Sequence, residues 1–411
     1  MPKGEIVVGL DIGTTKVVVT VAELEPEGNL NIIGLGEVPS GGLRKGIIVD
    51  IERTAQAISR AAAMAERMSG YRIRSAFVGI TGPHIESINN RGVVAVAGEN
   101  REIEIDDVQR VLQAARVIPL PAERQIIHVL PRQYIVDGYD GIIDPVGMTG
   151  SRLEVETVIV TAAGAAVQNL LKSVQRAGLE VEQLVLTPLA AAEGVLYQAE
   201  KELGAVVVDL GGGTTEIALV AQGSLWFAAV LPVGGEHITS DLAVGLRTPI
   251  SQAEKLKKEW GAVPVNSVPD NELLPVPNVG GYGEHKVSRK MLAGIIQPRV
   301  EEILSLVHQQ IGRADFKGLL PGGVVLTGGG ALLPGIGELA SEILQLPVRI
   351  GAPARLGGLA DMVSSPAYAA SVGMVIHGAK NLVKVQAAAG REPFWNNLWS
   401  HFKVWLRELF Q

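Results

Sequence analysis

Two short segments rich in Gly and Thr carry the residue types that phosphate chemistry needs. The first begins at Asp11, where an apolar strand ends, and continues through Gly13-Thr14-Thr15-Lys16. The second begins at Asp209, again at the end of an apolar strand, and continues through Gly211-Gly212-Gly213-Thr214. Such a turn presents backbone N–H groups and hydroxyls to a polyphosphate, because glycine permits close backbone approach. The Asp can hold Mg²⁺ through water or orient an attacking water, and the Lys adds a charge for a phosphate oxygen.

The repetition of this pattern is more informative than either copy. One Asp-x-Gly-x-Thr turn is compatible with an ordinary hairpin, but two copies about half a chain apart predict two similarly folded lobes that face each other across a cleft. A third cluster, Gly328-Gly329-Gly330, follows the apolar strand 324–327 and precedes Leu333. By itself it fits a tight strand-to-helix connection. Beside the two Asp turns it predicts close backbone approach to the ribose and α-phosphate of a nucleotide.

The composition excludes several other chemistries. The 411 residues carry a net charge of −7, which argues against a general nucleic-acid surface. Cysteine is absent, so disulfides, thiolate metal sites and thiol nucleophiles are excluded, and the seven His are scattered. We expect no signal peptide at the start. No segment has the roughly 18–20 consecutive apolar residues of a spanning helix, so any membrane contact is expected to be peripheral.

The elements that position the turns alternate between strands and helices, which is typical of an α/β fold. The segment 83–160 breaks this alternation with strands and a helix of its own, so we interpret it as an inserted subdomain. The segment 261–284 is rich in Pro, Gly and Asn and predicts a loop or a subdomain edge. Strands are predicted at 6–10, 17–22, 75–80, 92–97, 125–130, 133–136, 157–161, 184–186 and 205–209, and helices at 52–69, 106–115, 165–176 and 288–310.

Taken together, these motifs resemble the superfamily of actin, Hsp70 and the sugar kinases. The resemblance rests on the two Asp turns, on the glycine cluster at 328–330 and on the segment 185–192, which contains Thr187-Pro188-Leu189-Ala190-Ala191-Ala192. Within the superfamily, the chain resembles the FtsA family of actin-like bacterial cell-division proteins. The stretches most similar to that family are 85–89, 134–138, 144–148 and 232–239.

The resemblance implies an actin-like (ribonuclease-H-like) two-lobed ATPase fold with an inserted α+β subdomain and a C-terminal amphipathic helix. It predicts a division of the chain into six parts. These are a first lobe at 1–82 and 161–203, the inserted subdomain at 83–160, a second lobe at 204–244 and 318–380, a small subdomain of the second lobe at 245–317, a linker at 381–392 and a terminal helix at 393–411.

The resemblance also implies ATP and Mg²⁺ as ligands and assigns residues to them. Asp11 and Asp209 would hold Mg²⁺ through water and act in hydrolysis. Glu254 and Lys257, on one predicted helix, would border the adenosine; the alternative is that they belong to a solvated helix face. The phosphate and ribose contacts would come from Gly13, Thr14, Thr15, Lys16, Gly211, Gly212, Gly213, Thr214, Gly328, Gly329, Gly330 and Leu333.

One position departs from the pattern of related bacterial actins. In those proteins an acidic residue precedes the Pro of the segment that matches 187–192, where it helps to polarise the hydrolytic water. This chain has Thr187 at that position. ATP binding survives such a change more easily than fast hydrolysis does, so the sequence predicts at most slow ATPase activity.

The last nineteen residues have the pattern of an amphipathic helix. Their apolar side chains fall within one arc of about 160° at ~100° per residue, and only Val404 interrupts the polar side. Enrichment in Trp and Phe favours a helix that lies in a membrane interface. The alternative is a helix that docks on the protein itself or on a partner. The arc consists of Phe394, Trp395, Leu398, Trp399, Phe402, Trp405, Leu406, Leu409 and Phe410.

The resemblance further implies partners and a location. FtsA-like proteins polymerise, work with other division proteins and tether FtsZ, the tubulin-like division protein, to the cytoplasmic face of the membrane at the division site. The FtsZ tail docks on the small subdomain of the second lobe, where Arg289, Lys290 and Arg299 are candidate contacts for an acidic peptide. These three cations could equally form a solvated helix face.

Two other functions fit the same class of fold. A small-molecule kinase would need an acidic base and a sugar-sized pocket between the lobes, and no motif for either is present. An actin-like scaffold of type IV pilus assembly would share the phosphate loops, but the aromatic terminal helix argues against it.

Overall fold

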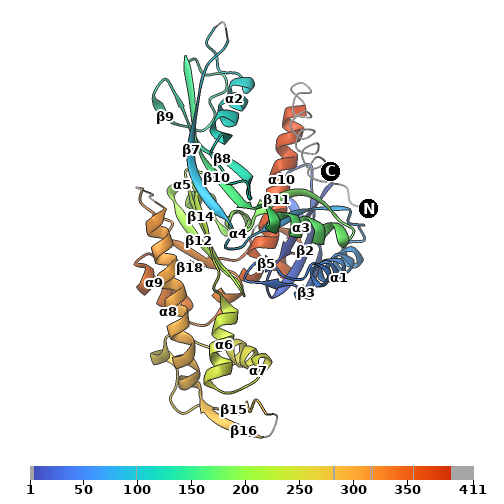
Figure 1. Ribbon diagram of the computed structural model, residues 1–411, viewed down its shortest axis with the longest axis vertical. Coiled ribbons are helices and arrows are strands. Elements are labelled where there is room, and N and C mark those ends of the chain that lie inside the picture. The colour runs from blue at the N-terminus through green and yellow to red at the C-terminus, as the bar shows by residue number, and fades with distance from the viewer. Residues whose placement is uncertain are drawn as a thin grey trace.

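The computed structural model describes residues 4–389, apart from 99, 281, 282, 315, 317 and 355, and describes side chains as far as 383. The molecule is elongated, with a subdomain of residues 86–163 at one end, two β-sheet lobes in the middle and a subdomain of residues 235–313 at the other end (Figure 1). In this part of the chain, no helix combines the length and the apolar character that a membrane span requires.

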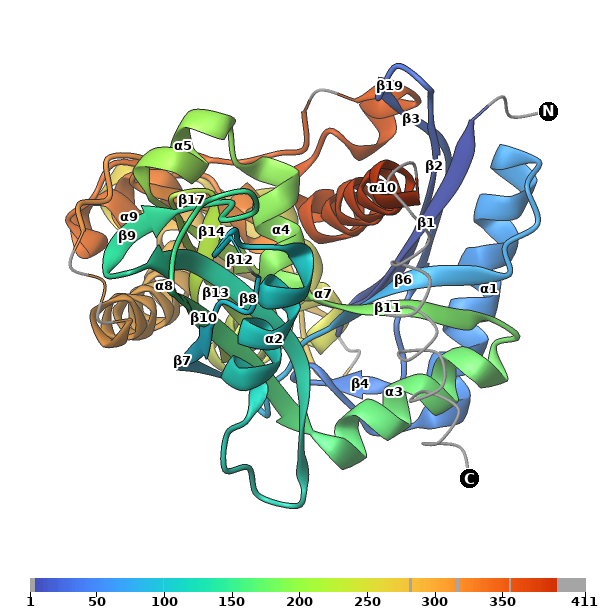
Figure 2. The same cartoon turned by 90° about the horizontal axis from the view of Figure 1, so that it is seen from above.

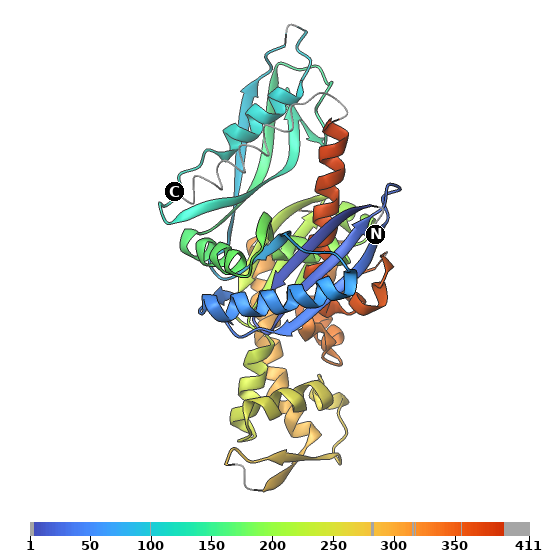
Figure 3. The same cartoon turned by 90° about the vertical axis from the view of Figure 1, so that its right-hand side faces the viewer.

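The first lobe is built on a six-stranded sheet in the order β11-β6-β1-β2-β3-β19. β1, β2 and β3 form an antiparallel meander, and β6 and β11 run parallel to β1. Helix α1 (Ile51–Ser69), capped by the Asp50 carboxylate and ended by Gly70 in the left-handed conformation, packs on β2 and β3 (Figure 3). The strands are β1 (Glu5–Ile12), β2 (Lys16–Leu24), β3 (Leu30–Pro39), β6 (Ser75–Ile80), β11 (Glu180–Leu186) and β19 (Gly357–Gly358).

The second lobe repeats this topology. Its five-stranded sheet has the order β14-β13-β12-β17-β18, in which an antiparallel meander is again extended by two parallel strands. The prediction of two similarly folded lobes is therefore confirmed at the level of sheet topology. The strands are β12 (Ala205–Leu210), β13 (Thr215–Ala221), β14 (Ser224–Leu231), β17 (Val324–Thr327) and β18 (Val348–Ile350), and the lobe also holds α5 (Gln198–Leu203) and α9 (Ile336–Leu344).

The subdomain inserted into the first lobe has a four-stranded sheet, β7-β10-β8-β9, with α2 (Ile105–Arg116) packed on it. The two strands predicted at 125–130 and 133–136 are one strand, because Pro131 sits beside a register irregularity that tolerates its missing N–H. This subdomain also contacts the second lobe, where the Ser87 hydroxyl donates to the Ala228 carbonyl at 2.8 Å. Its strands are β7 (Glu86–Ala95), β8 (Arg124–Val136), β9 (Tyr139–Ile142) and β10 (Arg152–Ala163).

The end of the molecule beyond the second-lobe sheet consists of helices and one hairpin (Figure 1). Helix α8 (Arg289–Arg313) is 25 residues long and follows a hairpin of β15 (Leu273–Pro277) and β16 (Glu284–Ser288). Part of that hairpin lies in the segment 261–284, for which the sequence predicted a loop or a subdomain edge, and Leu274, Val276 and Val287 supply a small buried face to the core. Helices α6 (Gly235–Gly245) and α7 (Ile250–Trp260) complete this end.

Helix α10 (Ala369–Ala389) lies between the lobes, against β1 of the first lobe and against α4 (Thr187–Val195), as Figure 2 shows. It corrects one prediction. The segment 381–392 was expected to be a linker, but residues 381–389 continue this helix, because they contain neither Gly nor Pro and consist largely of good helix formers. The predicted membrane helix at 393–411 lies outside the described residues.

Candidate nucleotide-binding cleft

The two predicted phosphate turns close with the same geometry. In the first lobe, the backbone N–H of Gly13 donates to the carbonyl of Lys16 at 2.9 Å, at the tip of the β1–β2 hairpin. In the second, the N–H of Gly211 donates to the carbonyl of Thr214 at 2.9 Å, at the tip of the β12–β13 hairpin. Each four-residue turn therefore presents the same backbone shape to the space between the lobes.

The two turns contact each other directly. A Cβ added to Gly212 would lie 2.3 Å from the Cγ2 atom of Thr15, and one added to Gly213 would lie 2.5 Å from the Oγ1 atom of Thr14. Only glycine fits at either position, because any side chain would overlap the opposing turn. The structure thus brings together the two turns that lie far apart in the sequence.

The Asp residues of the two turns repel each other. Burial raises the pKa of Asp11 to about 6, against the opposing effect of the Lys16 charge. Burial together with the charge of Asp11 raises the pKa of Asp209 to about 7. Lys16 is the cation that lowers both pKa values, and its single charge does not balance two ionised carboxylates. A hard cation between them would relieve the repulsion.

Lys16 has two other contacts. Its ammonium lies 2.8 Å from a carboxylate oxygen of Glu37 and 3.9 Å from the centre of the Tyr368 ring. These contacts hold the end of the side chain at the rim of the first turn.

The glycine cluster at 328–330 packs against the end of β12. Gly328 has a φ of 81°, and a Cβ there would lie 2.1 Å from the Oδ1 atom of Asp209. Gly330 lines a cavity of about 20 Å³ together with Leu210, Gly234 and Gly235, enough for one water molecule. Leu333 lies one turn further on, at the end of the 3-10 turn 329–332. The cluster predicted from the sequence therefore borders the second Asp turn.

Glu254 and Lys257 lie on α7, close to this cavity. The ammonium of Lys257 lies 2.6 Å from the Glu254 carboxylate, donates to the Gly235 carbonyl at 2.9 Å and donates to the Thr239 hydroxyl at 2.8 Å. Lys257 thus faces α6 rather than solvent. Burial lowers its pKa, and the partner carboxylate opposes that effect.

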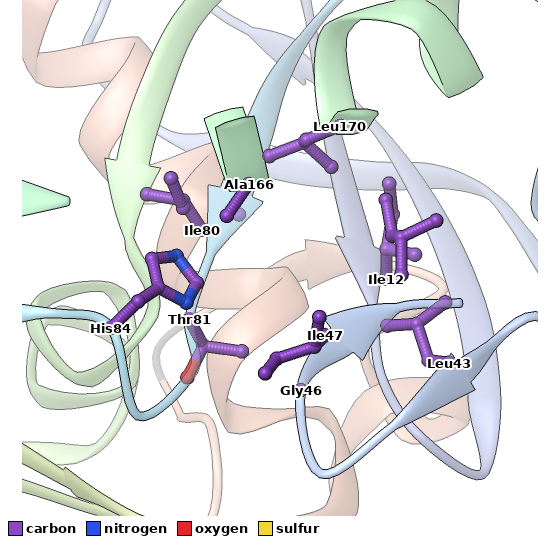
Figure 4. A pocket seen from close by; sticks show the side chains of 11 residues that line it. Ile12, Leu43, Gly46, Ile47, Ile80, Thr81, His84, Ala166 and Leu170 are labelled. Carbon is purple, nitrogen blue, oxygen red and sulfur yellow. The ribbon is translucent and has the colours of Figure 1, made fainter. Parts of the chain in front are cut away.

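A second small cavity lies on the first-lobe side of the turns. It measures about 20 Å³ and opens between β1, β6 and α3 (Gly164–Arg176). In Figure 4 the side chains of Thr81 and His84 line one side of it, and those of Ile12 and Leu43 line the other. Neither ring nitrogen of His84 has a hydrogen-bond partner within the described residues, and burial lowers the pKa of this ring. One water molecule fits here.

Sequence reasoning missed one carboxyl group of the cleft. Glu216 lies directly opposite Asp209 in the β12–β13 pairing and is buried. Burial and the charge of Asp209 raise its pKa well above the usual range. The signal was present in the sequence, because in a hairpin with a four-residue turn the residue seven positions after Asp209 must face it. At the same position of the first hairpin stands Val18.

Other predicted positions have partners within the protein. Thr187 begins α4 and is buried, and its hydroxyl has no hydrogen-bond partner among the described residues. Arg289 lies 3.0 Å from Glu272, Lys290 pairs with Asp270, and Arg299 makes a bidentate pair with Asp241 at 2.6 and 3.0 Å. The three candidate partner contacts are thus ion-paired rather than purely solvated.

Two repeated lobes whose Gly/Thr hairpins face each other define the class of this protein: it has an actin-like fold. The solved structures with this fold include "Crystal structure of MreB5 of Spiroplasma citri bound to ADP", with a TM-score of 0.55 and 17% identity over 95% of this chain and 100% of that one. Another is "PilM-PilN type IV pilus biogenesis complex", with a TM-score of 0.65 and 18% identity over 91% and 98%. At these identities the likeness concerns the fold alone.

Sequence comparison then identifies the family. A family profile described as "Cell division protein FtsA" matches residues 206–373, and one described as "SHS2 domain inserted in FTSA" matches residues 82–161. "Cell division protein FtsA" of Pseudomonas aeruginosa is 44% identical over 375 residues, 91% of this chain and 89% of the relative. The protein of the same name from Bacillus subtilis is 43% identical over 381 residues, 93% and 85%. The chain belongs to the FtsA family of cell-division proteins.

Proposed function

We propose that this FtsA-family protein binds Mg·ATP between its lobes, hydrolyses it slowly, assembles into filaments and tethers FtsZ to the cytoplasmic face of the membrane at the division site. One observation carries the nucleotide part of this proposal. Two Gly/Thr turns meet face to face, each with an Asp at its base, and burial, together with the charge of Asp11 in the case of Asp209, raises the pKa values of both Asp residues.

In this proposal the two turns hold the phosphates. The backbone N–H groups of 13–16 and 211–214 bind phosphate oxygens, and Lys16 adds a positive charge. Asp11 and Asp209 fit a Mg²⁺ held through water, because hard oxygen groups with raised pKa values gain from a divalent cation. The described residues contain no cluster of three or more His, Cys, Asp or Glu side chains that could form a complete metal site, so phosphate and water oxygens would complete the coordination. When bound, the cation neutralises charge on the β- and γ-phosphates.

Calorimetry with ATP tests this part of the proposal. We expect one nucleotide per chain, with affinity that falls when EDTA removes Mg²⁺. We also expect turnover well below the ~1–10³ s⁻¹ of typical enzymes, because the hydroxyl of Thr187 replaces an acidic group. A fast phosphate-release rate in the parent protein would contradict the second expectation, and absence of nucleotide binding would contradict the first.

The membrane part of the proposal rests on the sequence of the terminal helix. A fully buried aromatic side chain contributes about 1.5–3 kcal/mol, and less at an interface, so one helix should bind reversibly. Filaments would present many helices on one surface and raise the effective affinity. This accounts for a tether that depends on self-association.

Vesicle flotation tests the tether. Trp399→Glu places a charge in the middle of the apolar arc and should release the protein, as should truncation after Gly390. The matched control, Arg407→Gln on the polar side, should leave flotation unchanged. ATP should strengthen flotation of the parent if nucleotide promotes assembly. A folded Trp399→Glu variant that still floats would show that the helix docks on protein instead.

The partner part of the proposal concerns the surface of α8. An acidic FtsZ tail would compete with the present ion pairs, and Lys290 is the most open to this, since its side chain is 42% exposed and its partner Asp270 is 79% exposed. Lys290→Glu should weaken binding of an FtsZ tail peptide, whereas Lys172→Glu, an equal charge change on α3, should not. Equal peptide affinity for parent and Lys290→Glu would remove this surface from the proposal.

A further inference from the structure

The two carboxyl oxygens of the buried Glu216 differ in their hydrogen bonding. Its Oε1 atom accepts hydrogen bonds from the Thr81 hydroxyl at 2.6 Å and from the Thr214 hydroxyl at 3.3 Å. Its Oε2 atom is buried and has no hydrogen-bond partner among the described residues. A buried polar atom without a partner costs about 1–3 kcal/mol, so its presence in a functional cleft calls for a reason.

The hydrogen bond to Thr81 crosses between the lobes. Thr81 directly follows β6 of the first lobe, whereas Glu216 lies in β13 of the second. Gly46 of the first lobe also approaches here, since a Cβ on it would lie 3.0 Å from the Cγ2 atom of Thr214. The carboxyl group of Glu216 therefore enters from one lobe and is held by the other.

This contact places the carboxyl group beside the position at which the sequence lacks an acid. In the parallel pairing of β6 and β11, Ile80 is opposite Leu186. The next residues along the two strands are Thr81 and Thr187, so these two threonines lie at the same edge of the sheet. Thr187 contributes only a hydroxyl there, and within the described residues that hydroxyl has no hydrogen-bond partner. Through its hydrogen bond to Thr81, the carboxyl group of Glu216 lies at the same edge of the sheet.

A purely structural role for Glu216 accounts for its hydrogen bonds to the two threonines but not for a carboxyl group at this position. An amide side chain could accept the same two hydroxyl hydrogen bonds without placing an ionisable group opposite Asp209. What an amide of this shape would lose is a second acceptor oxygen, Oε2, which is not bonded to the threonines. That oxygen has no hydrogen-bond partner in the part of the chain that the structure describes.

We propose that Glu216 orients the attacking water during ATP hydrolysis, a part that an acidic residue at position 187 would otherwise take. The inference rests on the proposed nucleotide function and adds a residue to it. The water oxygen forms a bond to the γ-phosphorus while the bond from that phosphorus to the β,γ-bridging oxygen breaks. ADP leaves, and the proton of the water ends on the product phosphate. Glu216 accepts a hydrogen bond from that water, in company with Asp209.

The decisive variant is Glu216→Gln, which keeps the shape and the acceptor for Thr81. We expect turnover to fall at least ~10-fold while the affinity for Mg·ATP changes less than ~3-fold, since positioned acceptors typically contribute 10²–10⁴-fold to rate. Thr187→Glu, added to Glu216→Gln, should restore much of the lost turnover. Thr81→Val breaks the contact between the lobes but keeps the carboxyl group, and it should cost less turnover than Glu216→Gln. Glu216→Asp serves as the second carboxyl variant if the Gln variant unfolds.

Each outcome separates this inference from the proposed function. If calorimetry detects no Mg·ATP binding by the parent, the proposed function fails and the inference fails with it. If Glu216→Gln turns over at the parental rate, only the inference is overturned. If the parent binds Mg·ATP but has no turnover, the inference fails together with the hydrolysis part of the proposed function, while the binding part stands. Equal losses in Thr81→Val and Glu216→Gln, without rescue by Thr187→Glu, would assign Glu216 a structural role and also overturn it.

Discussion

The two Gly/Thr hairpins share a backbone geometry and differ in charge. In the first, Asp11 faces the apolar Val18 and the turn ends in the cation Lys16. In the second, Asp209 faces the carboxyl group of Glu216 and the turn ends in Thr214, which is neutral. The same four-residue turn thus carries a positive group on one lobe and an additional acidic group on the other.

Within the proposed function, this difference gives the two hairpins different roles. A cation beside a turn of N–H groups favours an anion, so the first hairpin is suited to holding phosphate. Two carboxyl groups beside such a turn disfavour an anion unless a metal ion or a water molecule lies between, so the second hairpin is suited to the chemistry at the phosphate. The repeated fold supplies the geometry, and a few side chains decide what each copy does.

The largest expected effect comes from the contact between the turns. Gly212→Val places a side chain where Thr15 and a phosphate both need space, and we expect more than ~100-fold loss of Mg·ATP affinity by calorimetry, equivalent to about 3 kcal/mol. Gly41→Ala is the matched control, because a Cβ there meets nothing within 4 Å. Parental affinity in the Val variant would show that this turn does not hold phosphate.

The second prediction compares how pH changes the stability contributed by Asp209 and by Asp11. The folded pKa of Asp209 is about 7, raised from its ordinary value of 3.8, so the folded protein binds the extra proton between these values. Stability contributed by this group is complete below about pH 4 and is lost as the pH rises through 7. Asp209→Asn avoids that loss, and it should raise the unfolding free energy of the nucleotide-free protein at pH 8 by on the order of 2 kcal/mol.

Denaturant unfolding at pH 4.5 and pH 8 measures this effect. The gain for Asp209→Asn should be much smaller at pH 4.5, where the parental carboxyl is largely protonated. Asp11→Asn should give a smaller gain at pH 8, because the pKa of Asp11 is raised only to about 6. Equal stability of parent and Asp209→Asn at both pH values would contradict the electrostatic account.

In turnover assays Asp209→Ala should reduce hydrolysis while sparing much of the binding.

A third prediction isolates the cation of the first hairpin. Lys16→Gln should weaken Mg·ATP binding about tenfold, since a hydrogen bond to a charged group contributes about 1.5–3 kcal/mol. Its effect on stability should stay below ~1 kcal/mol, because the ion pair with Glu37 is partly exposed. Lys172→Gln, an exposed lysine on α3, is the control and should leave affinity unchanged. Unchanged affinity in Lys16→Gln would show that the two hairpins do not differ in the way proposed.

The smallest effect is expected at the partner of that cation. Glu37→Gln releases Lys16 from its ion pair and leaves the ammonium available to phosphate. We expect nucleotide affinity to rise by no more than ~3-fold, because an exposed ion pair of this kind contributes about 0–1 kcal/mol. Calorimetry at low salt is the most sensitive measurement, since salt screens exposed charges. A loss of affinity would show that Glu37 holds Lys16 in its binding position.

Local sequence patterns predicted individual strands and helices well. The prediction of strand 75–80 matches β6 at both ends, and the predicted helix at 52–69 differs from α1 by one residue, because capping residues and apolar periodicity act over a few neighbours. The linker prediction at 381–392 relied on small residues near 386–390. It was wrong for 381–389, where α10 continues, because Ala is a strong helix former and small size alone does not indicate a linker.

By itself, the sequence determined that two Asp turns of one kind would be built on two similar hairpins, because each turn depends only on the residues within it. Only the tertiary structure decided what surrounds them. Glu216 accepts a hydrogen bond from Thr81, 135 residues away on the other lobe, and Lys257 donates to the carbonyl of Gly235 on a neighbouring helix. Hydrogen bonding and pKa depend on distances between elements that the chain brings together only on folding, and no local pattern contains those distances.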